Sequence, residues 1–231
     1  TALHFVGQGD AMADWTFVES GGKTKVTWGF DGDAHGSMVA RWFNLAMEPM
    51  MGPQFESGLA DMKKVVEAGP KVDIRGLEAS LSDDAAVTVA YVELSSAKDN
   101  ESVKNALGPA FGQVMGALAG GQVEAAGMPI VVTTSEEGEQ FAMWAAIPVV
   151  AEPAAPLADA AVRFGTVGGG KAARTTHKGA YSGLGDTHAK LQAWMGIHQA
   201  KGSGAPWEQF VNETGNTPEA ELLTEIHYPV E

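Results

Sequence analysis

The chain has 231 residues, of which 45% are hydrophobic and none is cysteine, and a formal net charge of −14 at pH 7. This length allows one or two globular domains, while the absence of cysteine excludes disulfides and thiolate metal sites. No run of about 18 apolar residues is present, which excludes a membrane-spanning helix in this sequence. The negative charge argues against nucleic acid as a partner, because phosphate binding needs lysine and arginine.

The first 68 residues predict a small antiparallel sheet followed by one long helix. Gly21-Gly22 is the turn between the last two strands, and after Gly36 the apolar residues adopt the three-and-four spacing of a helix. Pro49 and Pro53 predict that this helix is kinked or divided. The strands, rich in β-branched and aromatic residues, are predicted at 1–6, 13–20 and 24–31.

Two motifs in this region carry a resemblance to a known family. They are the segment Trp15 to Gly32, with its Gly-Gly turn, and the helical segment Gly52 to Lys63, which reads Gly-Pro-x-Phe-Glu-x-Gly-Leu-Ala-x-Met-Lys. Together they resemble the C-terminal half of a START-like domain of the SRPBCC or polyketide-cyclase type. The resemblance implies a helix-grip fold, in which a sheet curls around a long C-terminal helix and encloses an apolar cavity. We expect a preceding segment or a second copy of the chain, in a homodimer, to complete that sheet.

Residues 69–82 lack a periodic pattern and are predicted to be a linker. Residues 83–231 predict two β-α-β-β units, 83–150 and 163–231, joined by a Pro/Ala-rich connector at 150–162. In the first unit we expect strands at 86–94, 130–134 and 140–149 and a helix at 102–119. In the second we expect strands at 171–178, 207–213 and 221–230 and a helix at 184–199.

The two units have similar sequences, which indicates an internal duplication. Gly108 and Gly185 lie in the predicted helices at the spacing that also separates Gly127 from Gly204, and both closing strands end in Pro-Val. Units of this size bury a core only by packing on one another. Such packing leaves a concave seam between them, where small molecules commonly bind.

The second β-α-β-β unit, residues 163–231, resembles part of the GyrI-like small-molecule-binding domain. This is the effector-binding domain of AraC- and MerR-type multidrug regulators of bacteria. The resemblance implies a pseudo-twofold α+β domain and a binding glutamate in the Thr-Glu-Ile segment, here Glu225. This chain has Ala180 where the family usually has proline. The motifs that carry the resemblance are His177-Lys-Gly-Ala-Tyr181, Leu191-Gln-Ala-Trp194, Gly204-Ala-Pro-Trp-Glu208 and Glu221-Leu-Leu-Thr-Glu-Ile-x-Tyr-Pro-Val230.

Strand periodicity independently points to Glu225. It places Trp144, between two alanines, on one face of the first closing strand, and Glu225 and His227 on the corresponding face of the second. A carboxylate and an indole on one seam would hold a cationic or aromatic ligand through charge attraction and cation–π contact. The alternative is a solvated glutamate and core aromatic residues. The candidate ligand-binding residues are Glu225, Trp144, Tyr181, Trp207, Phe111 and His177.

Other patterns in the sequence are weaker indications of function. Gly165 to Ala172 fits most of a phosphate-binding loop, but it lacks the hydroxyl residue for Mg²⁺ and leads into a predicted strand, so we expect a flexible turn. The histidines show no metal-ligand spacing, and no Gly-x-Ser-x-Gly nucleophile motif occurs. We therefore expect no cofactor and no metal.

The sequence predicts a cytoplasmic, acidic protein that binds a small apolar ligand, cationic or aromatic, between the two units. A second apolar cavity is expected in the START-like part. The first alternative is a hydrolase of reactive small-molecule toxins, an activity that some GyrI-like proteins imply, with Glu225 as general base. The second is an interaction module whose open sheet edge pairs with another chain. Regulators of this family also carry a helix-turn-helix, which we do not find in this sequence, so DNA contact is not expected.

Overall fold

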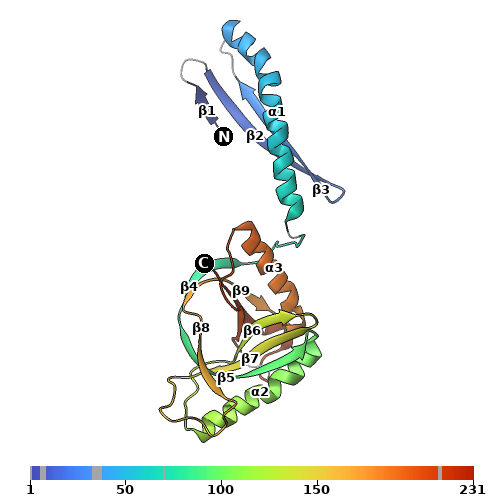
Figure 1. Cartoon of the computed structure of the whole chain (residues 1–231). Coiled ribbons are helices and arrows are strands. Elements are labelled where there is room, and N and C mark those ends of the chain that lie inside the picture. The colour runs from blue at the N-terminus through green and yellow to red at the C-terminus, as the bar shows by residue number, and fades with distance from the viewer. Residues whose placement is uncertain (1, 6–8, 33–37, 70, 213–214) are drawn as a thin grey trace. The chain divides into compact units, whose positions relative to one another are not determined.

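The structure is a computed structural model that describes residues 2–5, 9–32, 38–69, 71–212 and 215–231 (Figure 1). The contacts within the chain divide it into two compact units, Thr1–Gly69 and Pro70–Glu231. Thr1, Val6 and Gly36, which bear on the predicted first strand and helix start, lie outside the described residues. No helix in the described part of the chain is both long and apolar enough to cross a membrane.

The first unit is a three-stranded antiparallel sheet followed by one helix. Its strands β1 (Ala2–Phe5), β2 (Gly9–Ser20) and β3 (Lys23–Gly32) pair in chain order, and helix α1 (Met38–Ala68) follows. Gly21 and Gly22 have φ angles of 61° and 72°, as a two-residue hairpin turn requires. Trp15 stacks on Trp28 with ring centroids 4.7 Å apart, and Trp28 stacks on Phe55 of α1 at 4.2 Å.

Helix α1 runs through both prolines without a break. The predicted division at Pro49 and Pro53 therefore does not occur. Each proline removes one backbone N–H donor, and the N–H missing at Pro53 is the one that would bond the carbonyl of Pro49. The two defects therefore lie in successive turns on one side of the helix, and the remaining hydrogen bonds continue it.

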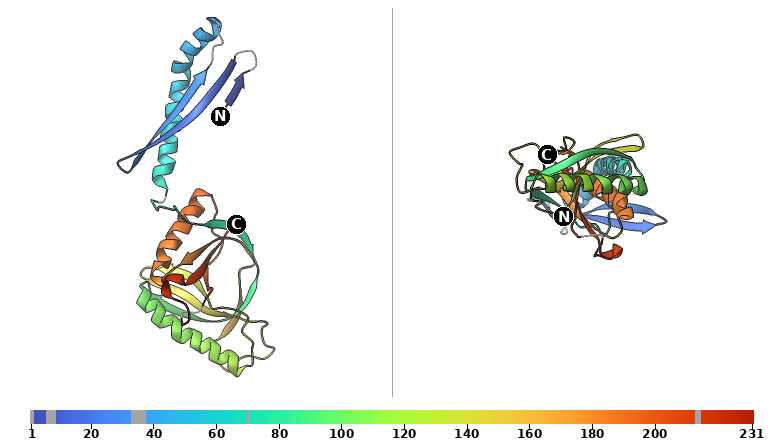
Figure 2. Two further views of the ribbon diagram at one scale, coloured as in Figure 1. Left: turned by 180° about the vertical axis from the view of Figure 1, so that it is seen from behind. Right: turned by 90° about the horizontal axis from the view of Figure 1, so that it is seen from below.

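The second unit contains an eight-stranded antiparallel sheet that curls round on itself, with helices α2 and α3 on its outer side (Figures 1 and 2). The strand order is β4-β9-β11-β10-β6-β7-β5-β8. Two short 3₁₀ turns, at Tyr181–Gly183 and Glu219–Glu221, complete the elements. The elements are β4 (Ala79–Asp84), β5 (Val87–Ala97), α2 (Asn100–Gly120), β6 (Ile130–Glu137), β7 (Gln140–Pro148), β8 (Arg163–Val167), β9 (Gly170–Lys178), α3 (Leu184–Ile197), β10 (Trp207–Phe210) and β11 (Leu223–Pro229).

The predicted duplication is confirmed, because β5-α2-β6-β7 and β9-α3-β10-β11 have the same order and pairing. The two copies meet where β6 pairs with β10. They also exchange a strand. Strand β4, which leads into β5, pairs with β9 of the second copy, while β8, which leads into β9, pairs with β5 of the first. Three strand pairs therefore join the two copies: β6 with β10, β4 with β9, and β5 with β8.

Strands β4 and β8 are two corrections to the sequence prediction. β4 begins inside the segment predicted as a linker, 69–82, and β8 contains Gly165, which was predicted as part of a flexible turn. The turn between β8 and β9 is shorter and consists of Gly168 and Gly169, with φ angles of 76° and 88°. It leads into a strand, as predicted, and not into the helix that a phosphate-binding loop needs.

Two core clusters lie between the outer face of the sheet and the two helices. Val114 and Leu118 of α2 are fully buried against Ala90 and Ile147. Leu191 and Met195 of α3 pack in the same way on Ala173 and Ile226. A third buried cluster, which includes Tyr91 and Trp207, packs on the inner face of the curled sheet.

Candidate ligand-binding site

The alternation of side chains along β7 and β11 decides which residues reach the inner face. Ala145 and Ile147 pack with α2, whereas Trp144 and Ala146 belong to an inner cluster that includes Trp207. In β11, Ile226 and Tyr228 pack with α3, so Glu225 and His227 face inward. The faces predicted for both closing strands are confirmed at these positions.

The inner face carries two aromatic stacks. Tyr91 of β5 and Trp144 of β7 lie with ring centroids 4.1 Å apart, and Gly165 makes room for them, since a Cβ there would come 3.1 Å from the Tyr91 ring. Trp207 and His227 are paired directly across β10 and β11, and their rings stack at 3.7 Å with an interplanar angle of 7°. An open depression of about 540 Å³ follows β5, β6 and β7, lined by Glu93, Leu94, Ser95, Thr134, Ala142, Met143 and Trp144.

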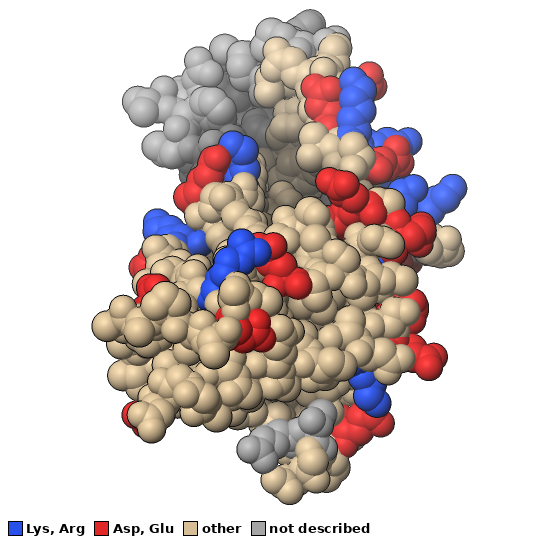
Figure 3. Space-filling view, turned by 60° about the horizontal axis from the view of Figure 1, so that its bottom comes forward, with Lys and Arg blue, Asp and Glu red and all other residues tan. Residues whose placement is uncertain are grey.

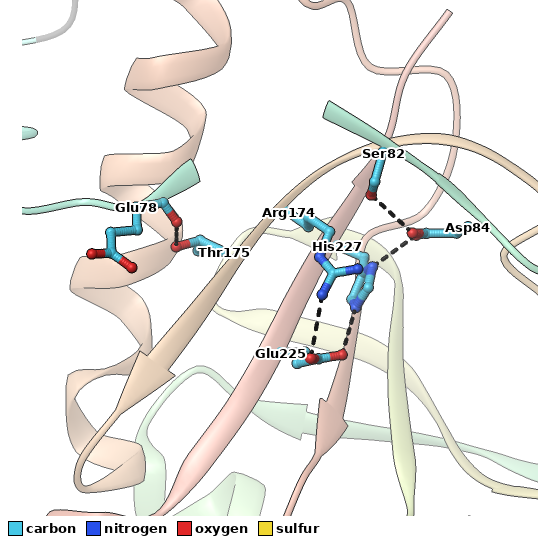
Figure 4. A network of polar contacts seen from close by, with 7 residues as sticks. All are labelled: Glu78, Ser82, Asp84, Arg174, Thr175, Glu225 and His227. Atoms are coloured by element: carbon cyan, nitrogen blue, oxygen red, sulfur yellow. Dashed lines mark hydrogen bonds and ion pairs between the residues drawn. The ribbon is translucent and has the colours of Figure 1, made fainter. Parts of the chain in front are cut away.

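A line of polar side chains crosses the inner face from β4 to β11 (Figure 4). Asp84 accepts a hydrogen bond of 3.2 Å from the Ser82 hydroxyl and one of 2.7 Å from Nδ1 of His227. Nε2 of His227 lies 3.6 Å from Oε2 of Glu225, and Nη2 of Arg174 donates to Oε1 of Glu225 at 3.4 Å. Charged groups from three neighbouring strands therefore converge on one histidine.

These groups differ in exposure. The side chains of His227 and Asp84 are 4% and 7% exposed, whereas those of Arg174 and Glu225 are 40% and 31% exposed. Among the described residues, Nε2 of His227 and Nε1 of Trp207 are buried without a hydrogen-bond partner. A buried polar atom without a partner is costly, so the inner face holds one donor and one acceptor group that a ligand could satisfy.

Some charged groups elsewhere on this unit form ion pairs. Arg163 bridges to Glu93 at 2.5 Å and lies 5.8 Å from the centre of the Tyr91 ring. On the face shown in Figure 3, acidic and basic side chains lie in small mixed groups, and the described part of that face has no extended patch of either sign. The described residues also contain no group of three or more side chains suited to a metal ion.

The structure brings only part of the predicted set together. Glu225, Trp144 and Trp207 lie on the inner face. Phe111, Tyr181 and His177 do not, because Phe111 and Tyr181 contact Phe210 on the outer, helix-bearing side, with centroids 6.3 Å and 5.3 Å from it. Burial raises the pKa of the Tyr181 hydroxyl.

His177 is buried beside α3 on that same outer side. Its ring nitrogens lie 2.8 Å from the Thr187 hydroxyl and 3.0 Å from the carbonyl oxygen of Ala180. These contacts hold the turn that leads from β9 into α3. His177 therefore has a structural environment in which both of its nitrogens are satisfied.

Sequence reasoning missed Asp84, Arg174 and the polar role of His227. His227 could have been found, because it follows Glu225 by two residues and so shares its face. Asp84 could not, because it contacts the site only through the pairing of β4 with β9. Sequence reasoning also missed an outer network in which His188 bridges Glu208 and Tyr228, at 2.7 and 2.9 Å. Burial raises the pKa of Tyr228 to about 12.

Comparison with known proteins adds a fold-level likeness. No protein-family model and no curated protein sequence matches the chain. The crystal structure of the EcmrR C-terminal domain is 21% identical, with a TM-score of 0.58, over 68% of this chain and 98% of that chain. EcmrR in its cryo-EM complex with DNA is 18% identical, with a TM-score of 0.60, over 85% of this chain and 73% of that chain. At these identities the likeness concerns the fold, and it agrees with the α+β architecture expected of a GyrI-like effector-binding domain.

Proposed function

We propose that the inner face of the second unit binds a small organic cation with an aromatic or apolar body, as a GyrI-like effector-binding domain would. The observation that carries this proposal is the environment of Glu225. Its carboxylate stands on the same face as two aromatic stacks, and among the described residues it accepts a hydrogen bond from Arg174, at 3.4 Å. That distance is longer than a strong charge-assisted hydrogen bond, so the carboxylate is available to a competing cation.

The surroundings suit such a ligand. Trp144, Tyr91 and Trp207 form an aromatic cluster on the same face of the sheet as the carboxylate. Cations are attracted to the faces of indole and phenol rings, by about 0.5–2 kcal/mol depending on desolvation. Arg174 and Glu225 are both partly exposed, so their contact contributes little to stability and its loss on ligand binding costs little.

The Glu225→Gln variant tests this proposal. With 2-naphthylmethylammonium as the probe, isothermal titration calorimetry should show saturable binding to the full wild-type chain. Affinity should fall about tenfold or more in the variant, because glutamine keeps the shape of the side chain but removes the charge that pairs with the cation.

Glu136→Gln is the matched control for that experiment. It makes the same change in β6, where Glu136 pairs with Lys98 in an exposed bridge, and it should leave the affinity unchanged. Equal affinity in wild type and Glu225→Gln, or no binding by wild type, contradicts the proposal.

Hydrolysis of a reactive substrate is the second candidate. It is favoured by one observation: a carboxylate, Asp84, orients a buried histidine whose other nitrogen has no partner among the described residues, an arrangement that suits a general base. Mass spectrometry after incubation with an electrophilic aromatic compound separates the two functions. A binding protein returns the compound unchanged, whereas a hydrolase adds water to it in a reaction lost in His227→Phe.

For the first unit, we propose that it is the C-terminal half of a START-like domain. Three antiparallel strands, a long helix and the Trp15–Trp28–Phe55 stack support this. Phe17 and Val18 are 64% and 52% exposed on opposite faces of β2, as expected where further strands would cover a larger sheet. Sedimentation of the full chain tests whether a second copy supplies them, because a chain that stays monomeric at every concentration excludes this.

A further inference from the structure

The most unusual atom on the inner face is Nε2 of His227. It is buried, and it has no hydrogen-bond partner among the residues that the structure describes. The ring cannot easily turn to find one, because it is stacked flat on Trp207 and its other nitrogen is bound to Asp84 at 2.7 Å. The direction of Nε2 is therefore fixed by the fold.

Asp84 also decides which nitrogen carries the proton of the neutral ring. An ionised carboxylate only accepts hydrogen bonds, and Asp84 already accepts one from Ser82. Nδ1 of His227 is therefore the donor, and Nε2 of the neutral imidazole is left as an acceptor. It faces a second acceptor, because Oε2 of Glu225 lies 3.6 Å away. Two acceptors at that distance repel one another until a donor lies between them.

A cationic N–H group suits this pair of acceptors. A single nitrogen can lie within hydrogen-bond distance of two acceptors this far apart and donate a different N–H to each. The other charged groups that face His227 are Asp84 from β4, which its Nδ1 already satisfies, and Arg174 from β9, which is turned to Glu225. Trp207 packs on the ring from β10. Nε2 is covered by neighbouring atoms, so the partly exposed Glu225 side chain has to shift to admit the ammonium group, which then lies between its carboxylate and Nε2.

We propose that His227 is a second recognition group of the site and selects cations that carry N–H bonds, such as protonated primary amines and amidines, over permanently charged cations without them. The inference rests on the proposed function, since Glu225 supplies the charge that any cation needs. His227 adds selectivity, because a trimethylammonium group has the same charge but nothing to donate to Nε2.

A matched pair of probes tests this directly. 2-Naphthylmethylammonium and its N,N,N-trimethyl derivative share one aromatic body and one charge, and only the first has N–H donors. At about pH 8 the wild-type chain should bind the first about tenfold more tightly, which is the effect of one hydrogen bond to a buried acceptor.

Two variants locate the preference. His227→Phe keeps the ring stacked on Trp207, and His227→Asn keeps a donor for Asp84, but both remove the Nε2 acceptor. Both should bind the two probes with nearly equal affinity. The outer-face variant His198→Phe should retain the preference, because His198 is exposed and stacks on Trp194 of α3. A preference that survives in both His227 variants contradicts the role of His227.

The outcomes separate this inference from the proposed function. Equal binding of the two probes by wild type, with both weakened in Glu225→Gln, overturns the inference and leaves the function standing. Absence of binding to wild type overturns both. Should the His227 variants fail to fold, the wild-type chain still decides, because a preference for the primary ammonium probe below about threefold contradicts the inference.

Discussion

Replacing Trp207 by alanine is expected to lower the free energy of unfolding of the second unit by about 3–5 kcal/mol. Trp207 is 5% exposed and belongs to the inner cluster with Ile130, Val132 and Ala146. Alanine would leave a cavity there, remove the ring that packs on His227 and weaken the strand pairing of β10 with both β6 and β11. Chemical denaturation followed by circular dichroism measures the loss.

Trp207→Phe is the control for this prediction. The indole Nε1 has no hydrogen-bond partner within the described structure, so phenylalanine removes no hydrogen bond and keeps an aromatic ring against His227. Its cost should be about 1–2 kcal/mol, from lost volume alone. If Trp207→Ala costs no more than Trp207→Phe, the inner cluster is less tightly packed than the structure indicates.

Gly168→Ala should be nearly as damaging, with a loss of about 2–4 kcal/mol. Gly168 has a φ angle of 76°, and a Cβ there would lie 2.5 Å from the backbone oxygen of Ala85. The contact is between two backbone segments, the β8–β9 turn and the β4–β5 connection, so neither can move aside without disturbing the exchanged strands. Thermal and chemical unfolding of the variant measure the effect.

The effect of the clash can be separated from that of the backbone conformation. Gly138, in the β6–β7 turn, also has a positive φ angle, of 54°, but nothing lies within 4 Å of a Cβ at that position. Gly138→Ala should therefore cost only the conformational part, about 1 kcal/mol. Equal losses for the two variants would mean that the connections at Gly168 yield to the added methyl group.

The sequence was most informative where local pattern and burial agree. Strands β7 and β11 alternate between a helix-packed face and an inner face, so Trp144 and Glu225 could be assigned to faces in advance. The helix expected at 184–199 is present as α3. The duplicated order of elements could also be read directly, because both copies keep the same turns.

What the sequence could not supply was pairing between distant segments. β4 reads Ala-Ser-Leu-Ser-Asp-Asp, a polar segment with no β-branched residue, and it is a strand because β9 offers it hydrogen-bonding groups. Asp84 reaches His227 only through that pairing. Tyr181 is a different case. Its motif was recognised in the sequence, but the turn after β9 directs its side chain to the outer side of the sheet, against Phe210.

The attachment of β4 has a consequence for communication along the chain. β4 is the first strand after residues 70–78, which tether the second unit to the first. Its ties include the Thr175 hydroxyl, which donates to the carbonyl of Glu78, and the bond between Asp84 and His227. A ligand that draws Glu225 away from Arg174 and His227 therefore acts on the group that anchors β4. Under the proposed function, occupancy of the inner face would act on the Asp84–His227 bond, and β4 is the strand through which that effect would reach residues 71–78.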